Sequence, residues 1–309
     1  MTAADRLLVV GEALVDIVHR HDGSVDEHPG GSPLNVAIGL ARLGHPVQYA
    51  ARFAPDRHGQ MIRDHLAREK LLTLTAGTDT AATTSVAEAY LDENGAATYH
   101  FDLTWDVGAA LDLAPVGHLH TGSIAATMKP GADDVLTVAR RTRDSGTISY
   151  DPNARPTIMG TPQEVRPQIE ALIALSDVVK ASDEDIEWLY PNEPIDDVMD
   201  QWGASGPRLV VVTRGWRGAY VLVTATSERA TLPSVPAGVV DTVGAGDSFM
   251  AGLISGLLDA GLLGDVTARE RLAAARLIDV LPVLDRASQC AAITVSRAGA
   301  NPPTRAELT

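Results

Sequence analysis

Apolar and polar residues alternate along the chain in a pattern typical of α/β proteins. Leu7 to Val18 is a mostly apolar run that predicts a single buried strand, and Pro33 to Leu43 carries apolar residues at helical spacing and ends before Gly44. Further strands are predicted at 47–53, 118–122, 147–151, 177–180, 209–213, 220–224 and 230–235. Helices are predicted at 60–70, 132–144, 162–175, 183–190 and 195–202. Because strands and helices alternate, we expect a mostly parallel sheet covered by helices on both faces.

Two segments depart from this alternation. Thr83 to Leu103 contains two strand-like runs around Asp92 to Gly95, where an Asn-Gly pair is typical of a β-hairpin turn. The last third contains two long helical patterns, 245–263 and 267–286, followed by a strand-like run from Ala291 to Ser296. No internal repeat or long linker interrupts the chain, so we expect residues 1–309 to form one α/β domain with a small β appendage.

The composition narrows the range of partners. The chain has 309 residues and a formal net charge of −15 at pH 7, and only three of its 25 basic residues are lysines (Lys70, Lys129 and Lys180). Such a surface repels nucleic-acid phosphates and anionic lipid, so we expect neither partner. The single cysteine, Cys290, excludes a disulfide within the chain and a cysteine-built zinc site. The apolar runs are too short for a signal peptide or a membrane span, which favours a cytoplasmic protein.

The segment from Asp241 to Asp247 is the chemically most informative part of the chain. Gly244, Ala245 and Gly246 are small residues at the start of a predicted helix, and Asp247 lies in its first turn. The first amides of a helix have no partner inside it, so the amides of Ala245, Gly246 and Asp247 predict a phosphoryl site. Beside that site, an ionised Asp247 could accept a proton from an attacking hydroxyl. A glycine-rich turn with an acidic residue near a helix start is the purely structural alternative.

Two separate segments together resemble one family. Asp-Thr-x-Gly-Ala-Gly-Asp at 241–247 resembles the C-terminal signature of the ribokinase-like sugar kinases, the phosphofructokinase-B (PfkB) family, and Gly30 to Ala37 resembles their N-terminal signature. The run from Gly11 to Asp16 is similar to the first strand of fructokinases. The resemblance extends over essentially the whole chain. It implies an ATP-dependent sugar kinase with a three-layer α/β/α fold and a small β-sheet lid at about 17–29 and 83–103.

The resemblance also implies roles for individual residues. It makes Asp247 the catalytic base, with Gly244, Ala245 and Gly246 around the transferred phosphoryl group. The residues implied to bind the sugar are Asp16, Gly30, Gly31, Asn35, Asn153 and Arg155. The last two follow a predicted strand, at the edge where open α/β sheets bind ligands. The residues implied to bind the nucleotide are Lys180, Thr213, Gly215 and Gly218.

Two metal ions follow from the same resemblance. Asp185 takes the place of the glutamate in the family's Asn-x-x-Glu motif, which supports Mg²⁺ through water, and Ser182 replaces the asparagine. A K⁺ site would use the backbone of Asp241, Val243, Thr294, Arg297 and Gly299. Closure of the β-sheet lid would exclude water from the reaction, and in some relatives such lids pair as homodimers.

The identity of the sugar stays open among several activities. Fructose, phosphorylated to fructose 6-phosphate, is favoured by the run from Gly11 to Asp16, whereas Asp151 to Arg155 is shared with 2-keto-3-deoxygluconate kinases. Those kinases carry Tyr-x-Arg in the lid, and Phe101–Asp102–Leu103 stands here instead, which we interpret as favouring a neutral sugar. A ribokinase or nucleoside kinase is an alternative. A non-catalytic sugar sensor on the same fold is another, although we would expect it to lack Asp247.

Overall fold

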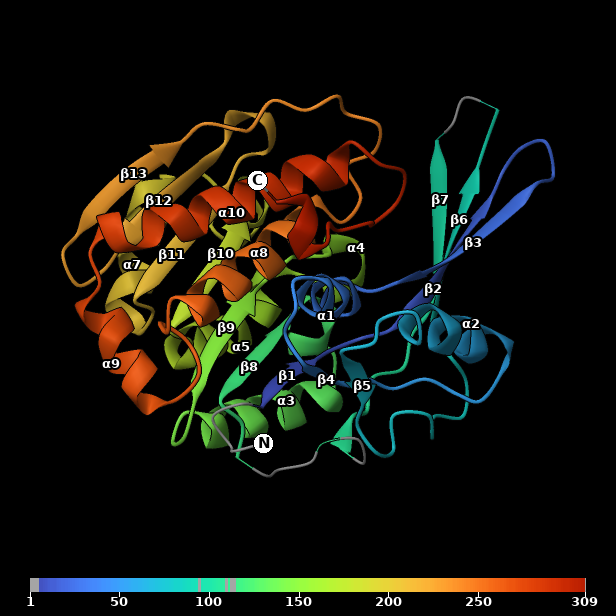
Figure 1. Ribbon diagram of the computed structural model, residues 1–309. Helices are drawn as coiled ribbons and strands as arrows, with labels where there is room; N and C mark the ends of the chain where they lie inside the picture. The colour runs from blue at the N-terminus through green and yellow to red at the C-terminus, as the bar shows by residue number, and fades with distance from the viewer. Residues whose placement is uncertain (1–5, 94–95, 109–110, 112–114, 309) are drawn as a thin grey trace.

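The computed structural model describes residues 6–93, 96–108, 111 and 115–308, and it contains a large and a small β-sheet (Figure 1). In spatial order, the large sheet consists of β13 (Glu228–Leu232), β12 (Ala219–Val223), β11 (Leu209–Thr213), β10 (Val178–Ser182), β9 (Thr147–Asp151), β8 (His118–Gly122), β1 (Leu7–Val10), β4 (Val47–Ala50) and β5 (Leu72–Leu74). Neighbouring strands are parallel except in the β11–β12 and β12–β13 pairs. The carboxyl ends of the parallel strands therefore meet at one edge of the sheet.

Helices cover both faces of the large sheet. One face packs against α1 (Ser32–Arg42), α8 (Ala245–Asp259), α9 (Val266–Ala274) and α10 (Leu277–Val295), and the other against α3 (Gly131–Thr142), α5 (Pro162–Leu175), α6 (Asp183–Leu189) and α7 (Ile195–Ser205). Alternate residues of β1 separate the two cores: Leu7 and Val9 face α1 and α8, whereas Leu8 and Val10 face α3 and α5. The predicted three-layer arrangement is confirmed. Across the described ranges, no helix is long and apolar enough to cross a membrane.

The small sheet projects from one side of the three layers (Figure 1). Its strands, in spatial order, are β3 (Val25–Gly30), β2 (Leu14–His19), β6 (Val86–Leu91) and β7 (Ala97–Asp102). Helix α2 (Arg57–Leu66) packs against β2 and β3. The Asn94–Gly95 turn predicted for the hairpin lies outside the described residues. Short elements complete the chain: α4 (Pro156–Met159), η3 (Ser123–Ala126), η4 (Gly215–Arg217) and η5 (Arg305–Glu307).

The prediction of one strand from Leu7 to Val18 is wrong. The run breaks at Gly11–Ala13, so that β1 joins the large sheet and β2 the small one. A Cβ on Gly11 would lie 2.1 Å from Cγ of Pro33, and the amide of Gly11 donates to Ala50 O at 3.1 Å. Both parts are apolar because both are buried, so the hydrophobic pattern carries no sign of the break.

The predictions for the last third also need correction. The pattern at 267–286 is divided between α9 and α10, because Arg276 caps α10 and its amide donates to Asp279 Oδ2 at 2.8 Å. The predicted strand from Ala291 to Ser296 is wrong, since this segment continues α10 to Val295. Helix α10 lies along α8, where a Cβ on Gly252 would come within 2.8 Å of Ala287 Cα. Close packing of these two helices overrides the strand preference of the β-branched residues.

Candidate active site

The start of α8 is fixed by a glycine. Gly244 has φ 74°, in the left-handed region, and a Cβ added there would lie 2.6 Å from Cβ of Ala300. The amide of Ala245 is used in the turn, where it donates to Thr242 O at 3.2 Å. Within the part of the chain that the structure describes, the amides of Gly246 and Asp247 meet no acceptor. Two of the three predicted amides are therefore available to an anion.

Asp247 is held by the start of α1. It is 8% exposed, and Ser32 Oγ donates to its Oδ1 at 2.6 Å while Asn35 Nδ2 donates to its Oδ2 at 2.8 Å. These bonds join residues more than 200 positions apart, so the two sequence signatures meet in space. Ser32 was missed as a site residue. The available signal was its place directly after the Gly30–Gly31 pair, at the first position of a helix.

The two glycines before α1 make room for their neighbours. A Cβ on Gly30 would lie 2.1 Å from Asp16 Oδ2, and a Cβ on Gly31, at φ 119°, would lie 2.4 Å from Glu12 O. Asp16 stands directly opposite His28 in the β2–β3 pair and is exposed to solvent. Desolvation by the surrounding protein raises the pKa of Asp16, and the charges of Arg155 and His28 oppose that rise. Asp16 and the glycine pair are thus neighbours, as expected of parts of one site.

The strand register of the small sheet corrects the argument that Asp102 favours a neutral sugar. Phe101 stands opposite Ala87, which stands opposite Asp16, so these three share a face of the small sheet. Asp102 is opposite Val86 and therefore lies on the other face. Asp102 does not face the same side as Asp16, and its charge gives no reason to favour a neutral sugar.

Glu12 is a buried acid at the break between β1 and β2. Its Oε2 accepts from the amide of Ala125 at 3.2 Å, and Tyr49 OH donates to its carbonyl at 2.7 Å. Burial raises the pKa of Glu12 to about 7, although hydrogen bonds, including one from Ser123, and the charge of Arg155 lower it. Glu12 entered the sequence analysis only as one letter of a motif, and its burial follows from η3 folding over it.

Asn153 and Arg155 form a compact turn after β9. Asn153 has a positive φ of 38°, and Arg155 Nη1 donates to Asn153 Oδ1 at 2.7 Å and to Ala154 O at 3.0 Å. Arg155 is exposed and folds back on its own loop. It acts on Asp16 and Glu12 through its charge, so it lies near the glycine pair without contacting α8 in the described hydrogen bonds.

Lys180, which the sequence analysis assigns to nucleotide binding, is buried and paired with an aspartate. It is 3% exposed, and its Nζ donates to Asp151 Oδ2 at 2.6 Å and to Gly246 O at 3.4 Å. Burial alone would lower the pKa of Lys180, but the carboxylates of Asp151, Asp185 and Asp247 raise it above its ordinary value. Lys180 is therefore a buried ammonium group beneath the start of α8.

Asp185 is occupied by protein donors. Its Oδ2 accepts from Ser182 N and Oγ, both at 2.7 Å, and its Oδ1 accepts from Ala154 N at 2.6 Å. The bond from Ser182 N and a reciprocal bond from Asp185 N to Ser182 Oγ at 3.0 Å form the capping box of α6. Among the described residues, no group of three or more His, Cys, Asp or Glu side chains could hold a metal ion. The contacts of Asp185 thus explain a structural cap and give its predicted link to Mg²⁺ no support.

The predicted phosphate loop leaves β11 as a tight turn. Thr213 stands opposite Ser182 and donates from Oγ1 to Ala181 O at 3.2 Å. Gly215 has φ 53°, and no atom lies within 4 Å of the point where a Cβ would stand, whereas a Cβ on Gly218 would lie 1.8 Å from Leu232 O. Gly218 is therefore required by the turn itself, and Gly215 faces open space.

The predicted K⁺ loops lie together. The Asp241 carboxylate accepts from Val243 N at 3.0 Å and from Gly299 N at 2.8 Å, which ties the two loops to each other. Thr294 lies inside α10, and its carbonyl already accepts from Arg297 N at 3.1 Å. The loops are adjacent as predicted, but Thr294 has a helical role that the predicted strand did not provide.

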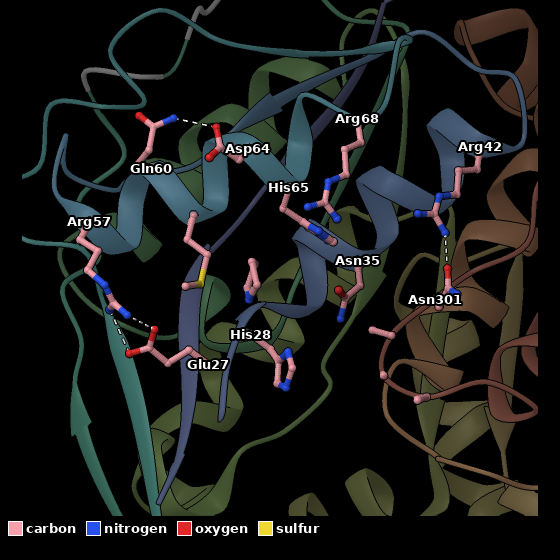
Figure 2. A pocket seen from close by; sticks show the side chains of 15 residues that line it. Glu27, His28, Asn35, Arg42, Arg57, Gln60, Asp64, His65, Arg68 and Asn301 are labelled. Atoms are coloured by element: carbon pink, nitrogen blue, oxygen red, sulfur yellow. Dashed lines mark hydrogen bonds and ion pairs between the residues drawn. The ribbon is translucent and has the colours of Figure 1, made fainter. Parts of the chain in front are cut away.

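A groove of about 730 Å³ opens next to Asn35, between β3, α1, α2 and the 298–301 loop (Figure 2). Two of its arginines are held by neighbouring side chains: Arg57 bonds Glu27, and Arg42 Nη1 donates to the neutral Asn301 Oδ1 at 2.6 Å. Because Asn35 also bonds Asp247, the groove reaches the candidate site from the side of α1 and α2. No sequence motif pointed to it, since its walls come from segments far apart in the chain.

Comparisons with known proteins relate the whole chain to one family. The model of the pfkB family carbohydrate kinases matches residues 4–307. A fructokinase from Klebsiella pneumoniae is 31% identical over 303 residues, which cover 96% of this chain and 94% of the relative. A solved fructokinase from Xylella fastidiosa with bound ATP has a TM-score of 0.82 at 24% identity, covering 96% of this chain and 94% of that one.

A second similar structure was solved with ligands bound. It is a fructokinase double mutant from Vibrio cholerae O395 in a form with fructose, ADP and potassium ion bound, with a TM-score of 0.77 at 25% identity. The match covers 96% of this chain and 94% of that one. Each of these matches covers 96% of this chain.

Proposed function

Because the chain belongs to the pfkB family of carbohydrate kinases, we propose that it transfers the γ-phosphoryl group of ATP to a primary hydroxyl of fructose and forms fructose 6-phosphate. The observation that carries the proposal is the start of α8, where the carboxylate of Asp247 lies beside two amides without acceptors among the described residues. A base next to a site for developing negative charge is the arrangement that phosphoryl transfer requires.

In this proposal Asp247 accepts the proton of the attacking hydroxyl. Ser32 and Asn35 each occupy one lone pair of its carboxylate, which leaves further lone pairs for the substrate. The same two bonds fix the direction of the carboxylate, so that the hydroxyl is aligned with the phosphoryl group. The amides of Gly246 and Asp247, behind the turn at Gly244 and Ala245, hold the charge that develops on the phosphoryl oxygens.

The proposed sugar site lies between the small sheet and α1. Asp16 accepts from sugar hydroxyls, and Asn35 keeps its amide oxygen for the same task while its nitrogen holds Asp247. Gly30 and Gly31 let the backbone approach the sugar closely. Asn153 and Arg155 border the proposed sugar site at the end of β9. The small sheet acts as a lid that excludes water from this site.

Thr213, Gly215 and Gly218 are the residues proposed to bind the nucleotide phosphates. Mg²⁺ bound with ATP would neutralise phosphate charge, but Asp185 is occupied by protein donors, so no step is assigned to this ion. The loops of Asp241, Val243 and 294–299 are proposed to hold K⁺, in keeping with the potassium-bound fructokinase above. Equal turnover in K⁺ and in a potassium-free buffer of the same ionic strength would exclude this ion.

The choice of fructose rests on the relatives, which are named fructokinases. The test is ADP release with purified protein and a panel of acceptors: fructose, ribose, a nucleoside and 2-keto-3-deoxygluconate, ranked by kcat/KM. We expect fructose to rank first and Asp247→Asn to lose turnover with every acceptor. Sugar binding without ADP release from the wild type would instead identify a sensor.

We further propose that two copies pair through their small sheets. Among the described strands, β3 and β7 are the edges of this sheet, and exposed edges are available for pairing. Light scattering should give twice the chain mass of 32.5 kDa, and Val25→Lys, a charge at the exposed start of β3, should lower it. A monomer at all concentrations used in the activity assay would contradict the pairing.

A further inference from the structure

Lys180 packs against the second residue of α8 from inside the molecule. It lies in the middle of β10, with Asp151 at the end of neighbouring β9. Its Nζ lies 2.6 Å from Asp151 Oδ2 and 3.4 Å from Gly246 O, and a Cβ added to Gly246 would lie 3.1 Å from the same Nζ. The ammonium group and the first turn of α8 thus fit together without spare space.

The contact has a direction that matters for catalysis. Gly246 O and the amide of Asp247 belong to one peptide group, and in a trans peptide the carbonyl and the amide point in opposite directions. With Lys180 at Gly246 O, the Asp247 amide therefore points away from Lys180. The cation also polarises that peptide, which strengthens the amide as a donor to negative charge. The amide concerned is one of the two that meet no acceptor among the described residues.

We propose that Lys180 is a positioning residue for phosphoryl transfer: from inside the protein it holds the Gly246–Asp247 peptide so that the Asp247 amide faces the transferred phosphoryl group. Lys180 does not touch the substrate in this account. The inference rests on the proposed function, because it assigns the task of that amide. Asp151 anchors the ammonium group and balances its charge.

The pair is not arranged as a purely stabilising contact would be. Asp151 is fully buried, yet its Oδ1 has no hydrogen-bond partner among the described residues. A buried ion pair stabilises a fold only when its remaining acceptors and donors are satisfied. Lys180 directs one of its three N–H groups to Gly246 O. This carbonyl belongs to the first turn of α8, where a carbonyl is already an acceptor for the hydrogen bonds of the helix. Function at α8 explains this choice better than stability does.

Two single variants separate the alternatives. Lys180→Met removes the cation from Gly246 O, and we expect kcat to fall about 10- to 100-fold, somewhat less than the loss of a direct donor. KM for ATP and for the sugar should stay within about 3-fold, since the phosphoryl site matters most in the transition state. Asp151→Asn keeps an acceptor for Lys180 and keeps the ammonium group in place, so kcat should stay within about 3-fold. A merely structural pair would make the two variants equally impaired.

Two further variants serve as controls for effects on folding. Lys180→Met combined with Asp151→Asn removes both charges, and it should fold even if the single variant does not, because no unpaired charge stays buried. It should keep the low kcat. Arg269→Met removes a partly buried cation from Asp177, which precedes β10 at the amino edge of the sheet, and should reduce stability with unchanged kcat. A double variant with kcat within about 3-fold of the wild type would overturn the proposal.

A binding measurement distinguishes this inference from the proposed function. Calorimetry with ADP and aluminium fluoride, a mimic of the transferred phosphoryl group, needs no turnover. Wild type should bind the mimic at least about 10-fold more tightly than Lys180→Met, while both bind ADP alone equally. Equal affinities for the mimic would refute the role of Lys180 even in an active kinase. Failure of every sugar as an acceptor would refute the proposed function, whereas a difference in mimic binding would still support Lys180.

Discussion

Two buried charge clusters stand at opposite ends of β9 and β10, and they are built differently. At the amino ends, Asp177 Oδ1 accepts from Arg143 at 2.7 Å and from Arg269 at 2.9 Å, and its Oδ2 accepts from Ile148 N at 2.8 Å. At the carboxyl ends, Asp151 and Lys180 form a pair in which Asp151 Oδ1 lacks a partner in the described structure. The first cluster is satisfied by the protein, and the second is not.

The same difference extends to neighbouring hydroxyl groups. Near the amino ends, Thr147 Oγ1 bonds His118 Nδ1 at 2.8 Å and accepts from Gly264 N at 2.9 Å. Near the carboxyl ends, Thr121 Oγ1 and Tyr150 OH are buried and lack partners among the described residues. Buried polar groups are normally satisfied, so unsatisfied ones concentrated at one edge mark the edge that serves ligands. The comparison supports our assignment of a structural role to the amino edge of this sheet and of the proposed chemistry to its carboxyl edge.

The largest expected effect is at the carboxyl edge, from Asp247→Asn. The amide is isosteric, and it can accept from Asn35 and donate to Ser32, so the fold should be unchanged. Without a base, kcat should fall about 1,000-fold. Stopped or coupled ADP-release assays measure this, with circular dichroism as the folding control. Turnover near the wild-type rate would show that Asp247 is not the base.

Asp177→Asn, at the amino edge, should reduce the stability of the fold and leave kcat nearly unchanged. It leaves Arg143 and Arg269 without their carboxylate, and breaking a buried pair in this way reduces the free energy of unfolding by about 3 kcal/mol. The kcat of the folded protein should stay within about 2-fold, because this cluster lies at the amino edge of the sheet and the start of α8 lies at the carboxyl edge. Urea unfolding and ADP release on the same sample test both parts. A variant with normal stability and reduced kcat would reverse our assignment of the two edges.

Glu12→Gln should change how stability depends on pH. The pKa of Glu12 is about 7 in the folded protein against an ordinary value of 4.5, so the folded state keeps its proton longer than the unfolded state. The free energy of unfolding therefore falls as pH rises from about 4.5 to 7, by about 3 kcal/mol in total. Glutamine cannot ionise and lacks this contribution.

Urea unfolding of both proteins at pH 5 and pH 8 measures the effect. From pH 5 to pH 8, the free energy of unfolding of Glu12→Gln should rise relative to that of the wild type by up to about 3 kcal/mol. Glutamine can still accept from Ala125 N, so its own hydrogen bond is retained. An equal stability difference between the two proteins at both pH values would contradict a raised pKa of Glu12 in the folded state.

The smallest effects come from a matched pair of threonines. Thr147→Val removes a bonded hydroxyl and should reduce the free energy of unfolding by about 1–2 kcal/mol. Thr121→Val removes a hydroxyl that has no partner among the described residues and should leave stability unchanged or raise it by up to about 1 kcal/mol. Thermal unfolding of the two variants side by side gives the comparison. Equal losses would mean that Thr121 is satisfied after all.

Much of the fold could be predicted from local pattern. The strands at 118–122, 147–151 and 209–213 are found with their predicted bounds, because each is a short apolar run between turn residues. Both motifs of the site were also visible, since glycines and a helix start form a local signal. The end of α10 was not, because its β-branched residues are helical only through packing on α8.

Within the site, the sequence by itself determined which chemical groups are present and that α8 begins with free amides. It could not determine their partners. Ser32 and Asn35 on Asp247, Asp151 on Lys180, and Ala154 on Asp185 are contacts between segments that only the order of strands in the sheet brings together. Periodicity and turn chemistry act over a few residues, whereas a hydrogen bond depends on distance in space. The tertiary structure therefore decided which of the predicted residues meet and which of them hold the others in place.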